Sequence, residues 1–138
     1  MRFSLYNVIA SQDEATIVAK LSEDRFVLRR LDGANVRSAR EYWDASAKHL
    51  RHRIANGWDG YAEYLAEAVL PNDEEGNKIA FLWVHADLLI SSDLRAFLSA
   101  FDVLITLGRA AYARGTEMLI FLLGDGAAFP PMTDEESR

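Results

Sequence analysis

The sequence contains no cysteine. This absence excludes a disulfide scaffold, a thiol nucleophile and zinc sites built on cysteine. Its three histidines, His49, His52 and His85, show no recognisable metal-ligand spacing. No serine lies in a nucleophile elbow, and no glycine-rich loop is present to hold a phosphate. We therefore expect no cofactor, no metal site and no catalytic residues.

Long apolar runs are also missing. The apolar run from Met118 to Gly124 is too short to span a bilayer. The first residues are not followed by an apolar stretch with a small-residue cleavage site, so no secretory signal is predicted. Together these absences predict a cytoplasmic protein that does not associate with a membrane.

The length of 138 residues predicts a single domain, and half of the residues are hydrophobic, as in globular proteins. We expect an N-terminal extension over 1–24, a core over 25–126 and a polar tail over 127–138. Three apolar runs predict strands at Phe26–Leu31, Ile79–Val84 and Met118–Leu123. The last two are apolar nearly throughout, which is typical of parallel strands covered on both faces by helices. Within the extension, 2–9 could form a further strand and 15–21 a short helix.

Three helices are predicted between these strands. Ser38 and Glu41 form a capping box, in which Glu41 is expected to reach back to the backbone of Ser38. The helix that follows should run to about Arg51, with Trp43, Ala47 and Leu50 on one face. A second helix should run from about Trp58 to Val69, and a third from Ser92-Asp93 to just before Gly115. The expected fold class is therefore α/β, a small three-layer-type domain with a three-stranded parallel sheet and connecting helices.

Charge is unevenly distributed along the chain. The whole chain has 15 Lys and Arg against 21 Asp and Glu, a formal net charge of −6. Residues 25–56 carry eight Lys or Arg and three acidic residues, whereas residues 57–77 carry six Asp or Glu and neither Lys nor Arg. An acidic chain of this kind binds nucleic acid poorly and suits a basic partner.

The second predicted helix carries three carboxylates on one face. At about 100 degrees per residue, Asp59, Glu63 and Glu67 fall within about 80 degrees of one another. The sheet-packing residues are expected on the other side of the helix: Trp58, Tyr61, Ala62, Leu65 and Val69. Gly60 and Tyr64 lie beside the carboxylates, and Gly60 leaves a gap for a partner's backbone. The row of carboxylates is either an ordinary solvent face or an anionic surface that meets a basic cleft.

Four stretches in order resemble the barstar family of intracellular inhibitors of secreted bacterial ribonucleases. They are Leu31-Asp32-Gly33-Ala34-Asn35-Val36-Arg37-Ser38, then Asn56-Gly57-Trp58-Asp59-Gly60-Tyr61-Ala62-Glu63-Tyr64-Leu65, then Phe81-Leu82-Trp83-Val84-His85-Ala86-Asp87-Leu88-Leu89, and last Phe97, Phe101-Asp102-Val103-Leu104 and Arg114-Gly115 with the final apolar strand. The resemblance covers about residues 26–124. It implies a barstar-like fold and an inhibitor, or immunity protein, that occludes the active site of a ribonuclease or nuclease toxin as a 1:1 complex.

The resemblance also implies which residues bind the partner. Two acidic residues four apart, here Asp59 and Glu63, would plug the basic active site. The full expected partner-binding set is Asn56, Gly57, Trp58, Asp59, Gly60, Glu63, Tyr64 and Glu67. The chain departs from the family where the loop Arg51-His52-Arg53-Ile54-Ala55 is short and basic, and where Ala110 stands at a third acidic position.

Other functions remain open from the sequence. The target could be a toxin other than a barnase-type ribonuclease. A small enzyme would use Asp59 or Glu63 as a general acid or base, or His85-x-Asp87 as part of a metal site. A regulatory binding module without a nuclease partner is a further alternative.

Overall fold

The structure is a computed structural model that describes residues 4–8, 14–70 and 76–124. The predicted polar tail at 127–138 lies outside these residues. The order of elements along the chain is β1 (Ser4–Val8), α1 (Glu14–Glu23), β2 (Val27–Asp32), α2 (Ala39–Leu50), α3 (Trp58–Val69), β3 (Lys78–Val84), α4 (Ala86–Ser92), α5 (Leu94–Ala113) and β4 (Glu117–Leu123).

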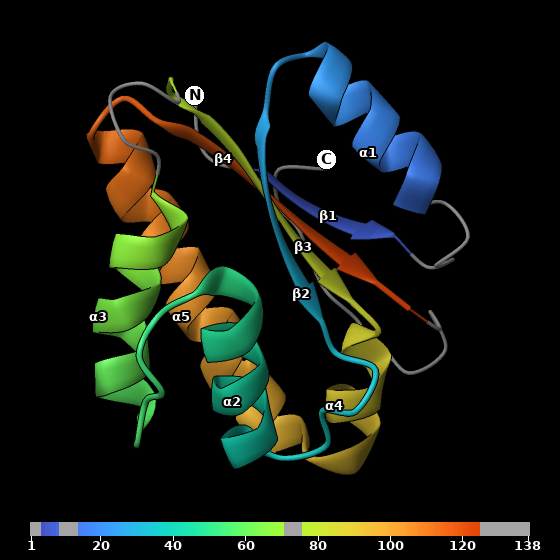
Figure 1. The fold of residues 1–138 in the computed structure, drawn as a ribbon, viewed down its shortest axis with the longest axis vertical. Coiled ribbons are helices and arrows are strands. Elements are labelled where there is room, and N and C mark those ends of the chain that lie inside the picture. The colour runs from blue at the N-terminus through green and yellow to red at the C-terminus, as the bar shows by residue number, and fades with distance from the viewer. Residues whose placement is uncertain (1–3, 9–13, 71–75, 125–138) are drawn as a thin grey trace.

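The strands form one parallel sheet in the order β1-β4-β3-β2 (Figure 1). The α/β class is confirmed, and the three predicted strands are present within one or two residues of their expected bounds. The described sheet has four strands because β1 adds to the free edge of β4. Thus the segment expected as an N-terminal extension supplies both β1 and α1.

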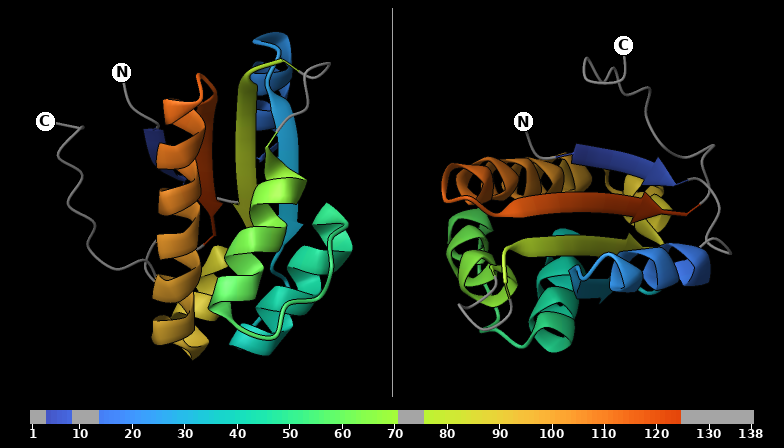
Figure 2. Two further views of the ribbon diagram at one scale, coloured as in Figure 1. Left: turned by 90° about the vertical axis from the view of Figure 1, so that its left-hand side faces the viewer. Right: turned by 90° about the horizontal axis from the view of Figure 1, so that it is seen from above.

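Helices cover the two faces of the sheet unequally. Helices α2 to α5 pack on one face, and α1 packs on the other (Figures 1 and 2). The chain crosses from β1 to β2 over the α1 face, and then returns strand by strand to β4 over the opposite face. The connection from β1 to β2 and the connections from β2 back to β4 run in opposite directions across the sheet and over opposite faces. They therefore have the same handedness, as is usual for crossovers between parallel strands.

The packing of β3 explains why its sequence is apolar from Ile79 to Val84. Ile79, Phe81 and Trp83 belong to the larger core beneath α2 to α5, whereas Ala80 and Leu82 belong to the smaller core beneath α1. All five are essentially buried. Alternate side chains from Ile79 to Trp83 therefore enter two different cores, so none of these five positions faces water.

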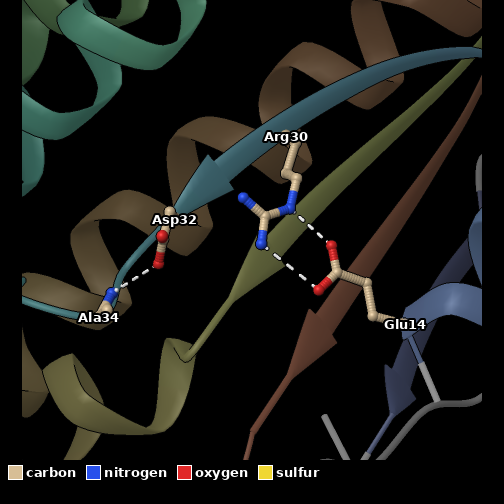
Figure 3. Close-up of polar contacts among 4 residues, drawn as sticks. All are labelled: Glu14, Arg30, Asp32 and Ala34. Atoms are coloured by element: carbon tan, nitrogen blue, oxygen red, sulfur yellow. Dashed lines mark hydrogen bonds and ion pairs between the residues drawn. The ribbon is translucent and has the colours of Figure 1, made fainter. Parts of the chain in front are cut away.

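Polar contacts fix α1 against β2 at the edge of the sheet. Figure 3 shows the guanidinium of Arg30 on β2 donating two hydrogen bonds to the carboxylate of Glu14 on α1. This interaction raises the pKa of Arg30, but the pair is partly exposed, so it stabilises the fold by no more than about 1 kcal/mol. Beside it, Asp32 accepts a hydrogen bond from the backbone N–H of Ala34 and shapes the turn that leaves β2.

Helix α2 begins as predicted but differs in detail. Ser38 accepts a hydrogen bond from the backbone N–H of Glu41, as expected for an N-cap. The carboxylate of Glu41 accepts from the backbone N–H of Arg37, not from that of Ser38, so the reciprocal bond lies one residue earlier than predicted. The buried face includes Tyr42 and Ser46 beside Ala47, whereas the predicted Trp43 and Leu50 are only half-buried.

The stretch between β3 and α5 contains a helix that the sequence did not predict. Helix α4 has seven residues, and Asp93 both ends it and caps α5 by accepting from the backbone N–H of Ala96. By length and composition α5 could cross a membrane, because its mean hydropathy is 1.3. Seven of its residues are buried in the domain, whereas Leu94, Leu98 and Tyr112 are exposed.

Candidate functional site

The N-terminal end of α3 is held in place from α2. Gly57 is the N-cap residue and makes no side-chain capping bond. The preceding Asn56 accepts a hydrogen bond from Arg40 on α2, at 3.2 Å between Nη2 and Oδ1. The guanidinium of Arg40 in turn lies 5.9 Å from the ring centre of Trp43. The loop that enters α3 is therefore tied to a neighbouring helix.

The three predicted carboxylates all point to solvent. Asp59, Glu63 and Glu67 are exposed, and among the described residues no ion pair or hydrogen bond engages them. Asp59 lies in the first turn of α3, where the helix dipole stabilises a negative charge. Glu67 lies in the last turn without that help. This face of α3 therefore carries charge that the fold itself does not neutralise.

The opposite face of α3 is buried, with one exception to the prediction. Tyr61, Leu65 and Val69 have no exposed surface, and Trp58 is half-buried. Ala62 was predicted on this face but is exposed. Ala62 lines the groove between α3 and α5, and its side chain is too short to reach across that groove.

An aromatic layer supports the N-terminal end of α3 from below. The ring of Trp58 lies 5.3 Å from that of Trp43, 5.8 Å from that of Tyr61 and 5.9 Å from that of Tyr42. Tyr42 also contacts Trp83 of β3, with ring centres 4.8 Å apart. These rings connect the first turn of α3 to the sheet, so the backbone that carries Asp59 rests on a packed support.

A buried chain of hydroxyl groups was not anticipated from the sequence. The hydroxyls of Tyr42 and Tyr61 are 2.6 Å apart, and Oγ of Ser46 lies 3.5 Å from the Tyr61 hydroxyl and 2.8 Å from Nε2 of His52. Burial raises the pKa of Tyr42 well above its ordinary value of 10, and it raises the pKa of Tyr61 as well. Both phenols therefore stay protonated at neutral pH and act as hydrogen-bonding groups.

The Ser46–His52 contact resembles a nucleophile beside its base, but its setting differs from a catalytic one. Ser46 is fully buried, so no substrate can reach its oxygen. Nδ1 of His52 lies 2.7 Å from the carbonyl oxygen of Arg53 and must donate to it. A ring that carries its single proton on Nδ1 then accepts from Ser46 through Nε2. The arrangement fixes the loop after α2 to the core.

The basic loop lies beside the C-terminal end of the carboxylate row. The guanidinium of Arg53 lies 5.3 Å from the ring centre of Tyr64, a cation–π contact from the loop to α3. Arg51, His52 and Arg53 line a depression of about 460 Å³ together with Tyr64, Glu67 and Ala68. Glu67 therefore lies near positive charge, whereas Asp59 and Glu63 do not share that depression.

A second depression, of about 490 Å³, lies at the N-terminal end of α3. It gathers six of the eight predicted partner-binding residues: Asn56, Gly57, Trp58, Asp59, Gly60 and Tyr64. At Gly57 and Gly60 an added Cβ would meet no atom within 4 Å. Packing within the domain thus gives no reason for glycine at either position. Because these two glycines have no side chain, they leave the surface beside Asp59 open.

Two of the residues considered for an enzyme, His85 and Asp87, lie at the start of α4. His85 is the N-cap residue of α4 with a left-handed backbone, at a φ of 58°. The Asp87 carboxylate occupies the space where Gly124 lacks a side chain. Within 4–8, 14–70 and 76–124, no three potential metal ligands come together.

No protein-family model matches the chain, and the curated proteins contain no match to it.

Proposed function

We propose that this protein is an inhibitor, an immunity protein, that binds the basic active site of a ribonuclease or nuclease toxin in the cytoplasm and forms a 1:1 complex. The observation that carries the proposal is the pair of exposed carboxylates, Asp59 and Glu63, without a neutralising partner among the described residues. Both lie on α3, whose opposite face is buried against the rest of the domain.

The chemistry of a nuclease active site suits this surface. Such a site holds the phosphates of RNA with Lys, Arg and His. Carboxylates that take the place of those phosphates are attracted by the same positive charges and exclude RNA. Complementary charge also speeds the encounter and selects the partner. The open surface at Gly57 and Gly60 lets the partner's chain approach Asp59 closely. The proposal requires neither turnover nor a cofactor.

A target other than a barnase-type ribonuclease is the second candidate, and the loop after α2 favours it. Arg51 and Arg53 are exposed beside Tyr64 and Glu67, where they would repel a uniformly basic enzyme. Ala110 offers no acceptor for a cation on the helix across the groove. The favoured partner therefore has a basic cleft opposite Asp59 and Glu63 and a neutral or acidic surface opposite the loop.

The test is an RNA-cleavage titration against two enzymes. We expect the nuclease encoded beside this gene to co-purify with the protein and to lose activity at one equivalent. We expect barnase to be inhibited weakly or not at all, because a partner charge buried without its mate costs several kcal/mol. Full activity of the neighbouring nuclease with excess protein, together with no complex, would reject the immunity function. Tight inhibition of barnase would reject only the account of specificity.

A further inference from the structure

Helix α5 carries more apolar surface than the domain buries. Its most apolar stretch has a mean hydropathy of 1.3, yet only 39% of that stretch is buried. Ala100 and Leu104 belong to the core and have no exposed surface. In contrast, Leu94, Leu98 and Tyr112 are 45%, 50% and 46% exposed. A single exposed apolar side chain is ordinary, but several on one helix mark a surface that a partner can cover.

The exposed apolar side chains of α5 lie along one line. Phe101 and Ile105 are half-buried and continue this line. At about 100 degrees per residue, all five side chains fall within about 60 degrees of one another. Their spacings of four, three, four and seven residues are those at which two helices pack along a shared seam. We call this set the α5 stripe: Leu94, Leu98, Phe101, Ile105 and Tyr112.

The α5 stripe points away from the rest of the helical layer. Helix α5 lies over β4 and beside α3 (Figures 1 and 2). The residues of α5 nearest to α3, such as Val103 and Ala110, lie at least about 120 degrees around the helix from the stripe. Because β1 is the outer neighbour of β4 and has no further described strand beside it, the stripe points toward the β1 edge of the sheet. A partner can reach it there without covering α3.

The charges beside the α5 stripe suit a second copy of this chain. Arg95, Asp102 and Arg109 are exposed on one flank of the stripe, seven residues apart, and none has an ion pair or hydrogen bond with a described residue. In an antiparallel pair of α5 helices centred between Leu98 and Phe101, Arg95 of each copy lies beside Asp102 of the other. The same ion pair then forms twice, as a contact closed by a twofold axis requires.

Charge also selects this register over its neighbours. With the centre half a heptad further along, Arg95 meets Arg109 and Asp102 meets its own copy, so that like charges repel. With the centre a whole heptad further along, Asp102 meets Arg109, but the two exposed leucines at the start of the stripe remain uncovered. Only the first register both pairs opposite charges and covers Leu94 and Leu98.

A lipid surface fits the α5 stripe less well than a second copy does. The chain has a formal net charge of −6, and the anionic headgroups of a cytoplasmic leaflet repel such a protein. Lipid also offers no counterpart to the alternating signs of Arg95, Asp102 and Arg109. The second copy offers both an apolar seam and the opposite charge at each position.

We propose that the α5 stripe is a self-association surface, on which two copies of this chain pack α5 against α5 in antiparallel orientation. Leu98 of each copy packs on Phe101 of the other, and Leu94 packs on Ile105. The stripe is narrower than the roughly 800 Å² per partner of a stable complex. The dimer is therefore weak, with a dissociation constant on the order of 10 to 100 µM. It leaves the carboxylates of α3 free and does not depend on the proposed function.

The first test is sedimentation velocity of the full chain over a range of about 5 to 500 µM, since dimerisation follows mass action. We expect the average mass to rise with concentration from 15.5 kDa toward twice that value. Leu98→Glu should weaken the dimer at least about 10-fold, because it places a charge in the apolar seam. The matched control is Ile54→Glu, which makes the same change at a side chain 63% exposed in the loop after α2, and it should leave the dimer unchanged. A mass of 15.5 kDa at every concentration, or equal losses from the two variants, would overturn the proposal.

The second test exchanges charges and examines the orientation of the helices. Arg95→Asp alone and Asp102→Arg alone should each weaken the dimer at least about 10-fold, because like charges then meet across the seam. A one-to-one mixture of the two variants should dimerise as tightly as the unsubstituted protein, because one copy carries two carboxylates where the other carries two guanidinium groups. Failure of the mixture to recover would refute the antiparallel pair. Flotation of the monomer with phosphatidylserine vesicles, abolished by Leu98→Glu, would assign the stripe to a lipid surface instead.

Discussion

If the proposed function holds, the two faces of α3 divide binding from stability. One face exposes Asp59, Glu63 and Glu67, whose carboxylates make no hydrogen bond or ion pair with another described residue. The other buries Tyr61 and Leu65 completely. Neighbouring residues along this one short helix therefore differ in role: the exposed ones are available to a partner, and the buried ones stabilise the fold. A substitution on one face should therefore change one property and leave the other nearly intact.

The largest expected effect is on binding, from charge reversal on the exposed face. Asp59→Lys or Glu63→Lys should weaken the nuclease complex at least about 100-fold, because a favourable charge contact becomes a repulsive one in a basic cleft. Glu67→Lys should cost less, since Glu67 already lies beside Arg51 and Arg53. Inhibition titrations and surface binding give the affinities.

The matched control is Glu23→Lys, at the end of α1 on the far face of the sheet. This variant makes the same change in charge at an exposed position, so it distinguishes the effect of a lost local contact on binding from the effect of the protein's net charge. The free energy of unfolding should change by no more than about 0.5 kcal/mol in all four variants. A loss from Glu23→Lys equal to that from Asp59→Lys would show that net charge alone controls binding.

The next effect is on stability, from the buried face. Tyr61→Phe removes one hydroxyl from the chain Tyr42–Tyr61–Ser46 and leaves buried polar atoms without that partner. We expect a loss of about 1 to 3 kcal/mol in the free energy of unfolding, measured by urea denaturation. At temperatures where the variant is folded, its affinity for the nuclease should equal that of the unsubstituted protein. An unchanged stability would mean that the buried hydroxyls are satisfied in another way.

Alkaline pH should act on the same buried pair. The raised pKa values of Tyr42 and Tyr61 mean that the folded protein keeps both phenols protonated after the unfolded chain has begun to lose its protons. The stability that they contribute is complete below pH 10 and is lost as pH rises above it. Each tyrosine should contribute a slope of about 1.4 kcal/mol per pH unit. Tyr42→Phe should reduce the slope measured above pH 10 by about that amount.

The smallest effect comes from Gly60, where the two faces meet, and it should have opposite signs for the two properties. Gly60→Ala should stabilise the free protein by up to about 1 kcal/mol, because alanine favours helix and its Cβ meets no atom within 4 Å. The same methyl group should weaken the nuclease complex, since it occupies the space beside Asp59. Thermal unfolding and inhibition titrations test the two signs. Equal affinity in this variant would show that the partner does not approach closely here.

Local signals in the sequence were sufficient for α3 itself. Its predicted bounds agree with the observed ones, and the exposure of the three carboxylates is confirmed. Both depend only on spacing within one helix, which a regular apolar pattern determines. The strands were equally predictable because their apolar runs are short, separate and rich in large aliphatic residues.

What the sequence did not predict depends on contacts between elements. Ser46 meets His52 because the chain reverses at Arg51, which adopts a left-handed backbone with φ of 60° without being glycine or asparagine. Ala62 is exposed because the groove between α3 and α5 opens at that point.

The place of β1 in the sheet has a consequence for the order in which the chain can fold. Strand β1 is made first, yet its described partner is β4, which is made last, and Ser4 pairs with Leu119. Pairing so distant in sequence is slow to form because the intervening chain must first be closed into a loop. On the ribosome, β1 must therefore wait without its neighbour until β4 has emerged. A nascent chain that stops before Glu117 leaves one edge of β3 unpaired, and such an open edge is a site where a second chain can add.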